Sequence, residues 1–341
     1  MFAQMKAAAL SELHFCEHGD LHAVIAIHNT RLGPALGGCR ILPYQSEAAA
    51  IADAIKLAKG MSYKAALAGV PQGGGKAVIM EPEGDYDRET LFREFGRFVN
   101  SLGGRYITAM DSGTEVEDMD AIRLTSPYVS SSSNIGDPSP STAMGVALGI
   151  SIAAQFQLHK SLDQLSVAIQ GLGHVGMDLA KRLHLAGARL VVSDIDSDKT
   201  DFARQYFKAC VVDVDDIFHA DVDVLAPCGL GGVLNQHSIP RLQCAIVAGC
   251  ANNQLMNEAA GDALADEGIL YAPDYVINSG GLIYCSTRYH GGNQAQVDSN
   301  IQRLGQTLLH IFSEARQHKV ASHRVANNLA ERILYGEQPH A

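Results

Sequence analysis

The stretch from Val167 to Asp194, VAIQGLGHVGMDLAKRLHLAGARLVVSD, decides the fold of this chain. It opens with three apolar residues, too few for a helix and suited to a buried parallel strand. Gly171, Gly173 and Gly176 then give a complete G-x-G-x-x-G where a strand should turn into a helix. The first glycine permits the tight turn, the second lets backbone approach a pyrophosphate, and the third lets the helix pack closely on the strand.

The residues after the glycines complete a β-α-β unit. Apolar residues recur at helical spacing over 177–185, and Gly187 is placed to end that helix. A second apolar run, 190–192, ends at Asp194, eighteen residues beyond the last fingerprint glycine. A carboxylate there can accept hydrogen bonds from both ribose hydroxyls and would repel a 2′-phosphate, which favours NAD over NADP.

A glycine fingerprint alone is a weak signal in a chain with 33 glycines, and the alternative is a structural turn that binds nothing. Here strand, turn, helix, second strand and acidic terminus all fall in register. The stretch therefore predicts a dinucleotide-binding domain of the Rossmann type.

Length and composition set the broad class. At 341 residues the chain exceeds the usual single domain, so two domains are expected. The 47% hydrophobic and 18% charged residues are typical of a soluble globular protein, and the net charge of −11 argues against nucleic acid or an anionic membrane as partner. No apolar run approaches the roughly 20 residues that span a bilayer.

Targeting and metal motifs are missing from the sequence. The start of the chain has no signal-peptide layout, because its short apolar patch soon meets Glu12 and His14. The seven cysteines are dispersed, odd in number and never in C-x-x-C spacing, which is typical of reduced cytosolic thiols. No H-E-x-x-H or similar spacing occurs, so we expect a cytoplasmic protein without a metal site.

Before the fingerprint, strands are expected at 23–28 and 77–80 and helices at 47–59 and 88–102. Residues 30–40, TRLGPALGGCR, are predicted to be a loop because they are rich in Gly and Pro. A further strand over 106–109 ends near Asp111, and strand ends are the usual place for chemistry in an α/β sheet.

A polar segment, residues 130–140, separates the two halves of the chain and is predicted to be the domain hinge. The fold class is therefore α/β with two domains. We expect an N-terminal α/β substrate and oligomerisation domain over 1–135, a Rossmann domain over 136–290, and C-terminal helices over 291–341 that return toward the first domain.

Two lysines and one aspartate are the chemical candidates. A lysine is suited to hold a carboxylate or polarise a carbonyl, and it becomes a base when desolvated beside another cation. Lys64 and Lys76 lie twelve residues apart, and Lys76 follows three glycines whose lack of side chains leaves it open to a ligand. The alternative is that both lysines are solvated surface charges, as most are.

Eight segments together resemble the Glu/Leu/Phe/Val family of amino-acid dehydrogenases over nearly the whole chain, most closely its leucine dehydrogenase branch. They are TRLGPALGGCR, MSYKAALAGVPQGGGKAVI, RYITAMDSGTEVEDMD, GDPSPSTAMGV, the glycine fingerprint, APCGLGGVLN, AGCANNQL and GILYAPDYVINSGGLI. The resemblance implies reversible oxidative deamination of an L-amino acid to its 2-oxo acid and ammonia, with hydride passed to NAD. It also implies a homo-oligomer, a dimer or a multiple of dimers.

The resemblance also implies roles for single residues. Lys76 corresponds to the catalytic lysine that activates water, Asp111 to the aspartate that relays protons, and Lys64 to the lysine that holds the substrate carboxylate. The other substrate-side positions implied are Gly37, Gly38, Asn278, Leu32, Ala109, Leu282 and Cys285. The cofactor-side positions are Gly171, Gly173, His174, Val175, Gly176, Asp194, Thr142, Ala251, Asn252 and Asn278.

Two departures from the family pattern leave these roles intact. Met110 stands where Glu is usual, and Cys39 replaces a common Thr. The pocket positions Leu32 and Leu282 favour a branched aliphatic substrate, Leu, Ile or Val, whereas Cys285 in place of Val alters the depth. An aromatic substrate, Phe or Trp, stays open because such pockets discriminate by only about 1–3 kcal/mol per methylene. A non-catalytic NAD-binding regulator is the third alternative, disfavoured by the intact Lys/Lys/Asp set.

Overall fold

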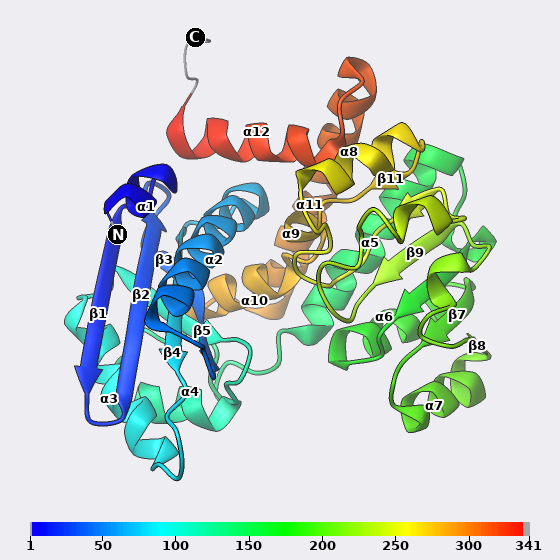
Figure 1. The fold of residues 1–341 in the computed structure, drawn as a ribbon. Helices are drawn as coiled ribbons and strands as arrows, with labels where there is room; N and C mark the ends of the chain where they lie inside the picture. The colour runs from blue at the N-terminus through cyan, green and yellow to red at the C-terminus, as the bar shows by residue number, and fades with distance from the viewer. Residues whose placement is uncertain (1, 337–341) are drawn as a thin grey trace. The chain divides into compact units, whose positions relative to one another are not determined.

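The computed structural model describes residues 2–336, which form two compact units (Figure 1). The chain first passes from unit 1 to unit 2 between Asp137 and Pro138, inside the polar segment 130–140. The final helices, expected as one segment, divide between the units. Unit 1 comprises Met1–Asp137, Cys285–Asn293 and Ala330–Ala341, and unit 2 comprises Pro138–Tyr284 and Gln294–Leu329.

Unit 1 is built on a mixed five-stranded sheet in the order β1-β2-β4-β3-β5. β2 is antiparallel to both β1 and β4, and β3 is parallel to both β4 and β5. The strands are β1 (Glu12–His18), β2 (Leu21–Asn29), β3 (Ala35–Leu42), β4 (Gly73–Met80) and β5 (Tyr106–Met110). The helices are α1 (Phe2–Ala7), α2 (Glu47–Ala68), α3 (Arg88–Ser101) and α4 (Val116–Arg123).

The sheet of unit 1 is covered on both faces, because successive side chains of a strand point to opposite sides. Ile25 and Ile79 belong to the core that includes α3 and α4, whereas Val24 and Val78 belong to the core that includes α2. Lys76 is two residues from Val78 on β4, so it shares the α2 face.

Two predictions in this region were wrong. Most of the segment 30–40 is not a loop, because β3 begins at Ala35 and lies between β4 and β5. The helix predicted over 47–59 continues to Ala68 and ends at Gly69, whose φ of +65° gives a left-handed C-cap. Lys64 therefore lies on this helix.

Unit 2 contains a six-stranded, fully parallel sheet in the order β11-β10-β9-β6-β7-β8. Counted from β6, this is the doubly wound order of dinucleotide-binding domains, and the strand order reverses between β6 and β9. The predicted fold class is confirmed. The strands are β6 (Ser166–Gln170), β7 (Arg189–Ser193), β8 (Cys210–Val211), β9 (Val224–Pro227), β10 (Ile246–Val247) and β11 (Leu270–Tyr271).

Helices cover this second sheet, and two of them, α10 and α12, run from one unit into the other. The α-helices are α5 (Ser139–Leu158), α6 (His174–Leu185), α7 (Ser197–Phe207), α8 (Glu258–Asp266), α9 (Asp274–Ile277), α10 (Gly280–Tyr289), α11 (Gln294–His318) and α12 (Ser322–Tyr335). Three short 3-10 turns are η1 (Leu162–Gln164), η2 (Ile217–His219) and η3 (Ile239–Arg241).

Helix α5 is long and apolar enough, by length and composition alone, to cross a membrane, so the statement that no run approaches that length was wrong. In the structure α5 packs against α6 and α11 within unit 2. A Cβ at its Gly149 would lie 3.1 Å from Leu308 of α11, so the glycine permits close helix packing. This is the pattern of a buried core helix.

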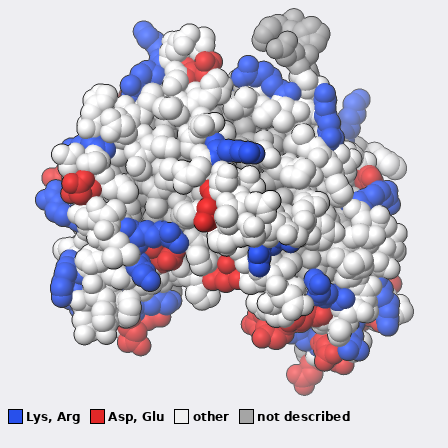
Figure 2. Space-filling view, turned by 180° about the vertical axis from the view of Figure 1, so that it is seen from behind, with Lys and Arg blue, Asp and Glu red and all other residues white. Residues whose placement is uncertain are grey.

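Charged side chains of both signs are interspersed over the face shown in Figure 2. No continuous basic area is visible on that face.

Candidate functional site

Glycines in β3 and β4 let the backbones and side chains of unit 1 approach closely at one place. A Cβ at Gly37 would overlap the carbonyl oxygen of Gly75 on the neighbouring strand. A Cβ at Gly38 would lie 2.6 Å from the Cβ of Asp111 and 3.3 Å from the Nζ of Lys76. The predicted residues Gly37, Gly38, Lys76 and Asp111 are thus brought together.

Lys76 and Asp111 form a buried ion pair, with 2.7 Å between Nζ and Oδ2. Lys76 is only 4% exposed, so it is not a surface lysine. Its burial lowers the pKa of the ammonium, and Asp111 opposes that effect. Burial also disfavours the charged form of Asp111, but the cations Lys76 and Arg40 outweigh it and lower the pKa of the carboxyl. The pair is suited to move protons.

Arg40 is a member of this site that the sequence analysis missed. Its Nε donates to the same Oδ2 of Asp111 at 2.9 Å, and its Nη1 donates to Asp53 at 2.9 Å. The available signal was an arginine directly after GGC at 37–39, in a segment that was predicted to be a loop. The strand assignment places it beside Asp111 instead.

Lys64 lies near the C-terminal end of α2 and is half-buried. Burial is the main cause that raises the pKa of the Cys285 thiol to about 12, and the positive charge of Lys64 opposes it. The two predicted substrate-side residues are therefore within electrostatic range of each other, although 221 positions separate them in the sequence.

The predicted pocket residues occupy different elements. Ala109 lies opposite Gly38 in the β3–β5 register, and Leu32 lies in the turn between β2 and β3. Leu282 and Cys285 are both buried and lie three positions apart on α10, which puts them on one helix face. Leu282 belongs to unit 2, whereas the other three belong to unit 1.

The fingerprint of unit 2 has the conformation that its glycines predict. Gly171 follows β6 with a φ of +97°, and a Cβ there would lie 2.8 Å from the amide nitrogen of Gly229, after β9. A Cβ at Gly176 would overlap the carbonyl oxygen of Gly171. A Cβ at Gly173 would meet nothing within 4 Å. The turn is thus closely packed against backbone at Gly171 and Gly176, and it is open to solvent at Gly173.

Gly173 is the N-cap of α6, which begins at His174 and continues through Val175. His174 is exposed, and Val175 is half-buried. The N-terminus of a helix favours a negatively charged group, and the strand order reverses at this place. The glycine turn and the N-terminus of α6 therefore fit a dinucleotide pyrophosphate.

Asp194 closes the other side of this turn. Its Oδ2 accepts a hydrogen bond from the amide of Leu172 at 2.5 Å, and its Oδ1 accepts one from the amide of Asp196 at 2.9 Å. The carboxylate is therefore held against the glycine turn by backbone donors. Its place after β7 fits a group that binds ribose hydroxyls.

Asn278 lies beside two other residues predicted on the cofactor side, Ala251 and Asn252, in unit 2. Its Nδ2 donates to the carbonyl of Cys250 at 3.1 Å and to Oδ1 of Asn252 at 2.9 Å. Its own Oδ1 is buried without a hydrogen-bond partner among the residues described. Ala251, next to Asn252, is buried as well. An orphaned buried acceptor at this place fits an amide donor such as that of a nicotinamide.

Thr142 lies at the start of α5, where its Oγ1 donates to the carbonyl of Pro138 at 3.3 Å. A Cβ at Gly281 would lie 2.7 Å from this Oγ1, so Thr142 packs against the first turn of α10. No hydrogen bond joins Thr142 to Asn278 within residues 2–336.

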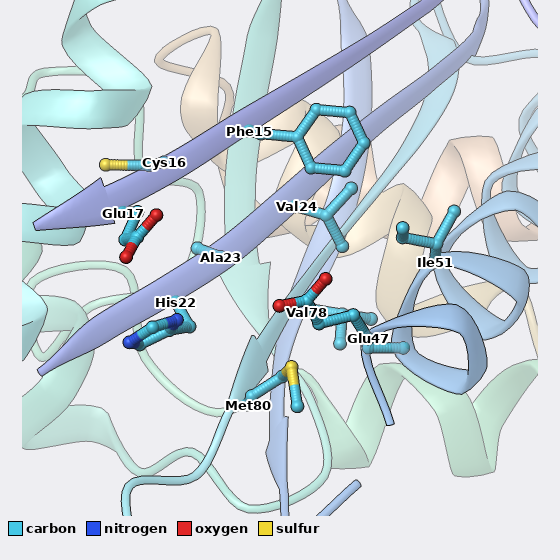
Figure 3. A pocket seen from close by; sticks show the side chains of 11 residues that line it. Phe15, Cys16, Glu17, His22, Ala23, Val24, Glu47, Ile51, Val78 and Met80 are labelled. Carbon is cyan, nitrogen blue, oxygen red and sulfur yellow. The ribbon is translucent and has the colours of Figure 1, made fainter. Parts of the chain in front are cut away.

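A hollow of about 360 Å³ in unit 1 is separate from these residues (Figure 3). Phe15 of β1, Val24 of β2, Ile51 of α2 and Met80 of β4 contribute to its lining. None of the predicted site residues lines it. In the described part of the chain, no group of three or more His, Cys, Asp or Glu residues is arranged to hold a metal ion.

Comparison with known proteins agrees with the two-domain α/β fold. Residues 14–127 match the family model "Glu/Leu/Phe/Val dehydrogenase, dimerisation domain", and residues 192–333 match "Glutamate/Leucine/Phenylalanine/Valine dehydrogenase". An L-tryptophan dehydrogenase of Nostoc punctiforme is 44% identical, covering 97% of this chain and 95% of the relative. A leucine dehydrogenase of Thermoactinomyces intermedius is 43% identical, covering 97% and 92%.

Among solved structures, the crystal structure of L-tryptophan dehydrogenase from Nostoc punctiforme superposes with a TM-score of 0.87, at 43% identity and with 98% of each chain covered. Sequence and fold thus agree over nearly the full length of both chains. The chain belongs to the Glu/Leu/Phe/Val dehydrogenase family of oxidoreductases.

Proposed function

We propose that this protein catalyses the reversible, NAD-dependent oxidative deamination of a branched-chain L-amino acid to its 2-oxo acid and ammonia. The observation that carries the proposal is the buried ion pair of Lys76 and Asp111, since ordinary lysines are exposed. A desolvated lysine beside a carboxylate is suited to proton transfer near neutral or alkaline pH. Bound NAD supplies the hydride acceptor.

The residues of the chain have three tasks in this proposal. The ammonium of Lys64 holds the substrate carboxylate. After the α-hydrogen has left as hydride and the amine has become an imine, Lys76 takes a proton from the water that attacks the imine carbon and stabilises the oxygen that becomes the carbonyl as ammonia leaves. Asp111 moves a proton to and from the amine nitrogen. Both cations that bind Asp111 use Oδ2, and among residues 2–336 no hydrogen bond reaches Oδ1, which leaves that oxygen for the substrate.

The substrate preference is tested by NADH formation at alkaline pH with Leu, Val, Ile, Phe and Trp. We expect kcat/KM for the branched aliphatics to exceed that for Phe and Trp by about tenfold or more. The reason is that Leu32 and Leu282 are medium-sized apolar residues. A preference for Phe or Trp would favour the alternative, the same reaction on an aromatic amino acid, which the 44% identity to a tryptophan dehydrogenase supports. No turnover with any L-amino acid would instead favour a non-catalytic NAD-binding regulator.

The choice of NAD over NADP is proposed to depend on Asp194. Replacing Asp194 with alanine should weaken NAD binding by about tenfold to a hundredfold and allow NADP to be used, because hydrogen bonds to a charged group contribute about 1.5–3 kcal/mol. Binding and kcat/KM are measured with both cofactors. Equal use of NAD and NADP by the unaltered enzyme would contradict the proposal.

Asp194→Asn is the matched control for the alanine variant. The amide oxygen can still accept from Leu172 or from Asp196, so one of the two hydrogen bonds to the turn is kept while the other and the negative charge are lost. We expect this variant to be more stable than Asp194→Ala, which loses both hydrogen bonds, and to gain NADP activity. A gain only in the alanine variant would mean that a loosened turn, and not charge, sets the preference.

We also propose that the enzyme is a soluble, cytoplasmic homo-oligomer. The match of residues 14–127 to a dimerisation domain supports the assembly, and seven free cysteines support a reducing compartment. Sedimentation velocity should show a dimer or a multiple of it. A single monomeric boundary at micromolar concentration, or a membrane or secreted fraction in cells, would contradict these proposals.

A further inference from the structure

The carboxylate of Asp111 is held by two cations at one oxygen. Lys76 approaches Oδ2 from β4 at 2.7 Å, and Arg40 approaches the same oxygen from β3 at 2.9 Å. Sharing one oxygen fixes the carboxylate in a single orientation, because each donor restricts rotation about the last side-chain bond. Arg40 is not among the residues that the family resemblance assigned.

Arg40 is itself anchored on the side away from Asp111. Its Nη1 donates to Oδ2 of Asp53 on α2 at 2.9 Å, and the hydroxyl of Tyr44 donates to the same oxygen at 2.6 Å. An unbroken chain therefore runs from Tyr44 through Asp53 and Arg40 to Asp111. The guanidinium bonds one carboxylate through Nε and the other through Nη1, and its planar fork fixes the angle between these two hydrogen bonds.

We propose that Arg40, anchored by Asp53 and Tyr44, is a positioning residue that orients the Asp111 carboxylate and keeps a second positive charge beside Lys76. The inference rests on the proposed function, in which this pair transfers protons. Arg40 acts through Asp111 and needs no contact with the substrate.

The positive charge of Arg40 lowers the pKa of both Lys76 and Asp111. A cation near Lys76 disfavours the protonated ammonium, so Arg40 adds to the effect of burial in lowering the pKa of Lys76. The same cation lowers the pKa of Asp111. Removal of the Arg40 charge should therefore raise the pKa of both groups, and the acid limb of the kcat/KM profile should move to higher pH.

Other ionisable groups surround the pair from each packed element. The groups nearest the pair are Cys39 on β3, Tyr106 on β5, Asp53 on α2 and Tyr44 after β3. Asp118 on α4 and Arg88 on α3 are charges that act on Cys39. Burial raises the pKa of the Cys39 thiol and the Tyr106 hydroxyl well above their ordinary values. Both groups stay neutral across the working pH range, so they cannot produce the expected shift.

The test compares Arg40→Gln and Arg40→Lys by pH–rate profiles. In Arg40→Gln, kcat should fall by about tenfold to a hundredfold, with the acid limb of kcat/KM moved up by about one pH unit. Arg40→Lys keeps the charge but lacks the planar fork that fixes both carboxylates, so kcat should fall while the acid limb stays in place. NAD binding should be unchanged in both. Arg93→Gln, which alters an exposed arginine paired with Glu89 on α3, should match the unaltered enzyme.

An active Arg40→Gln enzyme with an unchanged pH profile and kcat would overturn the inference while leaving the proposed function in place. An inactive unaltered enzyme would overturn the proposed function itself. In that case, the pH dependence of Lys76 acetylation by acetic anhydride, followed by mass spectrometry, tests the charge effect without turnover. An unchanged apparent pKa of Lys76 in Arg40→Gln would then overturn the inference, and a raised one would support it.

Discussion

Replacing Lys76 with alanine should abolish amino-acid-dependent NADH formation, with kcat lowered by about a thousandfold or more, while NAD still binds. A general acid–base group contributes about 10²–10⁴-fold, and Lys76 also stabilises the developing oxygen charge. The loss is measured as kcat with the best amino acid and as NAD affinity by calorimetry. The dinucleotide turn lies in unit 2 and Lys76 lies in unit 1, so cofactor affinity should survive.

Removing one partner of a buried ion pair also costs stability, so the alanine variant needs a companion. Lys76→Met keeps the length of the side chain without its charge and should be equally inactive. Lys56→Ala, an exposed position on α2, is the control that should behave as the unaltered enzyme. Retained turnover in a folded Lys76→Met enzyme would exclude Lys76 as the catalytic base.

Replacing Gly176 with alanine should remove dinucleotide binding and lower the melting temperature by several degrees. The added Cβ would overlap the carbonyl oxygen of Gly171, and neither atom belongs to a flexible side chain that can move aside. Overpacking of this kind costs about 1–3 kcal/mol, and each kcal/mol is about 2–4 °C in a domain of this size. Thermal unfolding and NAD titration measure both effects.

Gly173→Ala separates binding from folding at the same turn. Its Cβ would meet no protein atom within 4 Å, so the melting temperature should stay unchanged. The methyl group would occupy the space through which backbone approaches the pyrophosphate, so NAD affinity should fall by tenfold or more. Gly60→Ala, at an open position on α2, is the control and should lower neither the melting temperature nor the NAD affinity. NAD affinity in Gly173→Ala equal to that of the unaltered protein would show that this turn is not the cofactor site.

The sequence predicted more of the candidate site in unit 2 than in unit 1. In unit 2 the β6 turn, its helix and Asp194 were all predicted, because each signal spans fewer than thirty residues and depends on local backbone geometry. In unit 1 Asp111 was correctly placed at a strand end, since β5 ends at Met110. Which charges neutralise Asp111 was not predicted, because Arg40 lies 71 positions away in sequence.

The sequence by itself therefore determined the doubly wound domain and its glycine turn, because the left-handed backbone of Gly171 and the absent Cβ of Gly176 are properties of single residues. Only the tertiary structure decided that β3 is a strand. Gly37 and Gly38 have low strand propensity, and they are extended because β4 and β5 hydrogen-bond to both sides of this segment. That same placement brings Arg40, Lys76 and Asp111 together, since three strands distant in sequence must first pair before their side chains can meet.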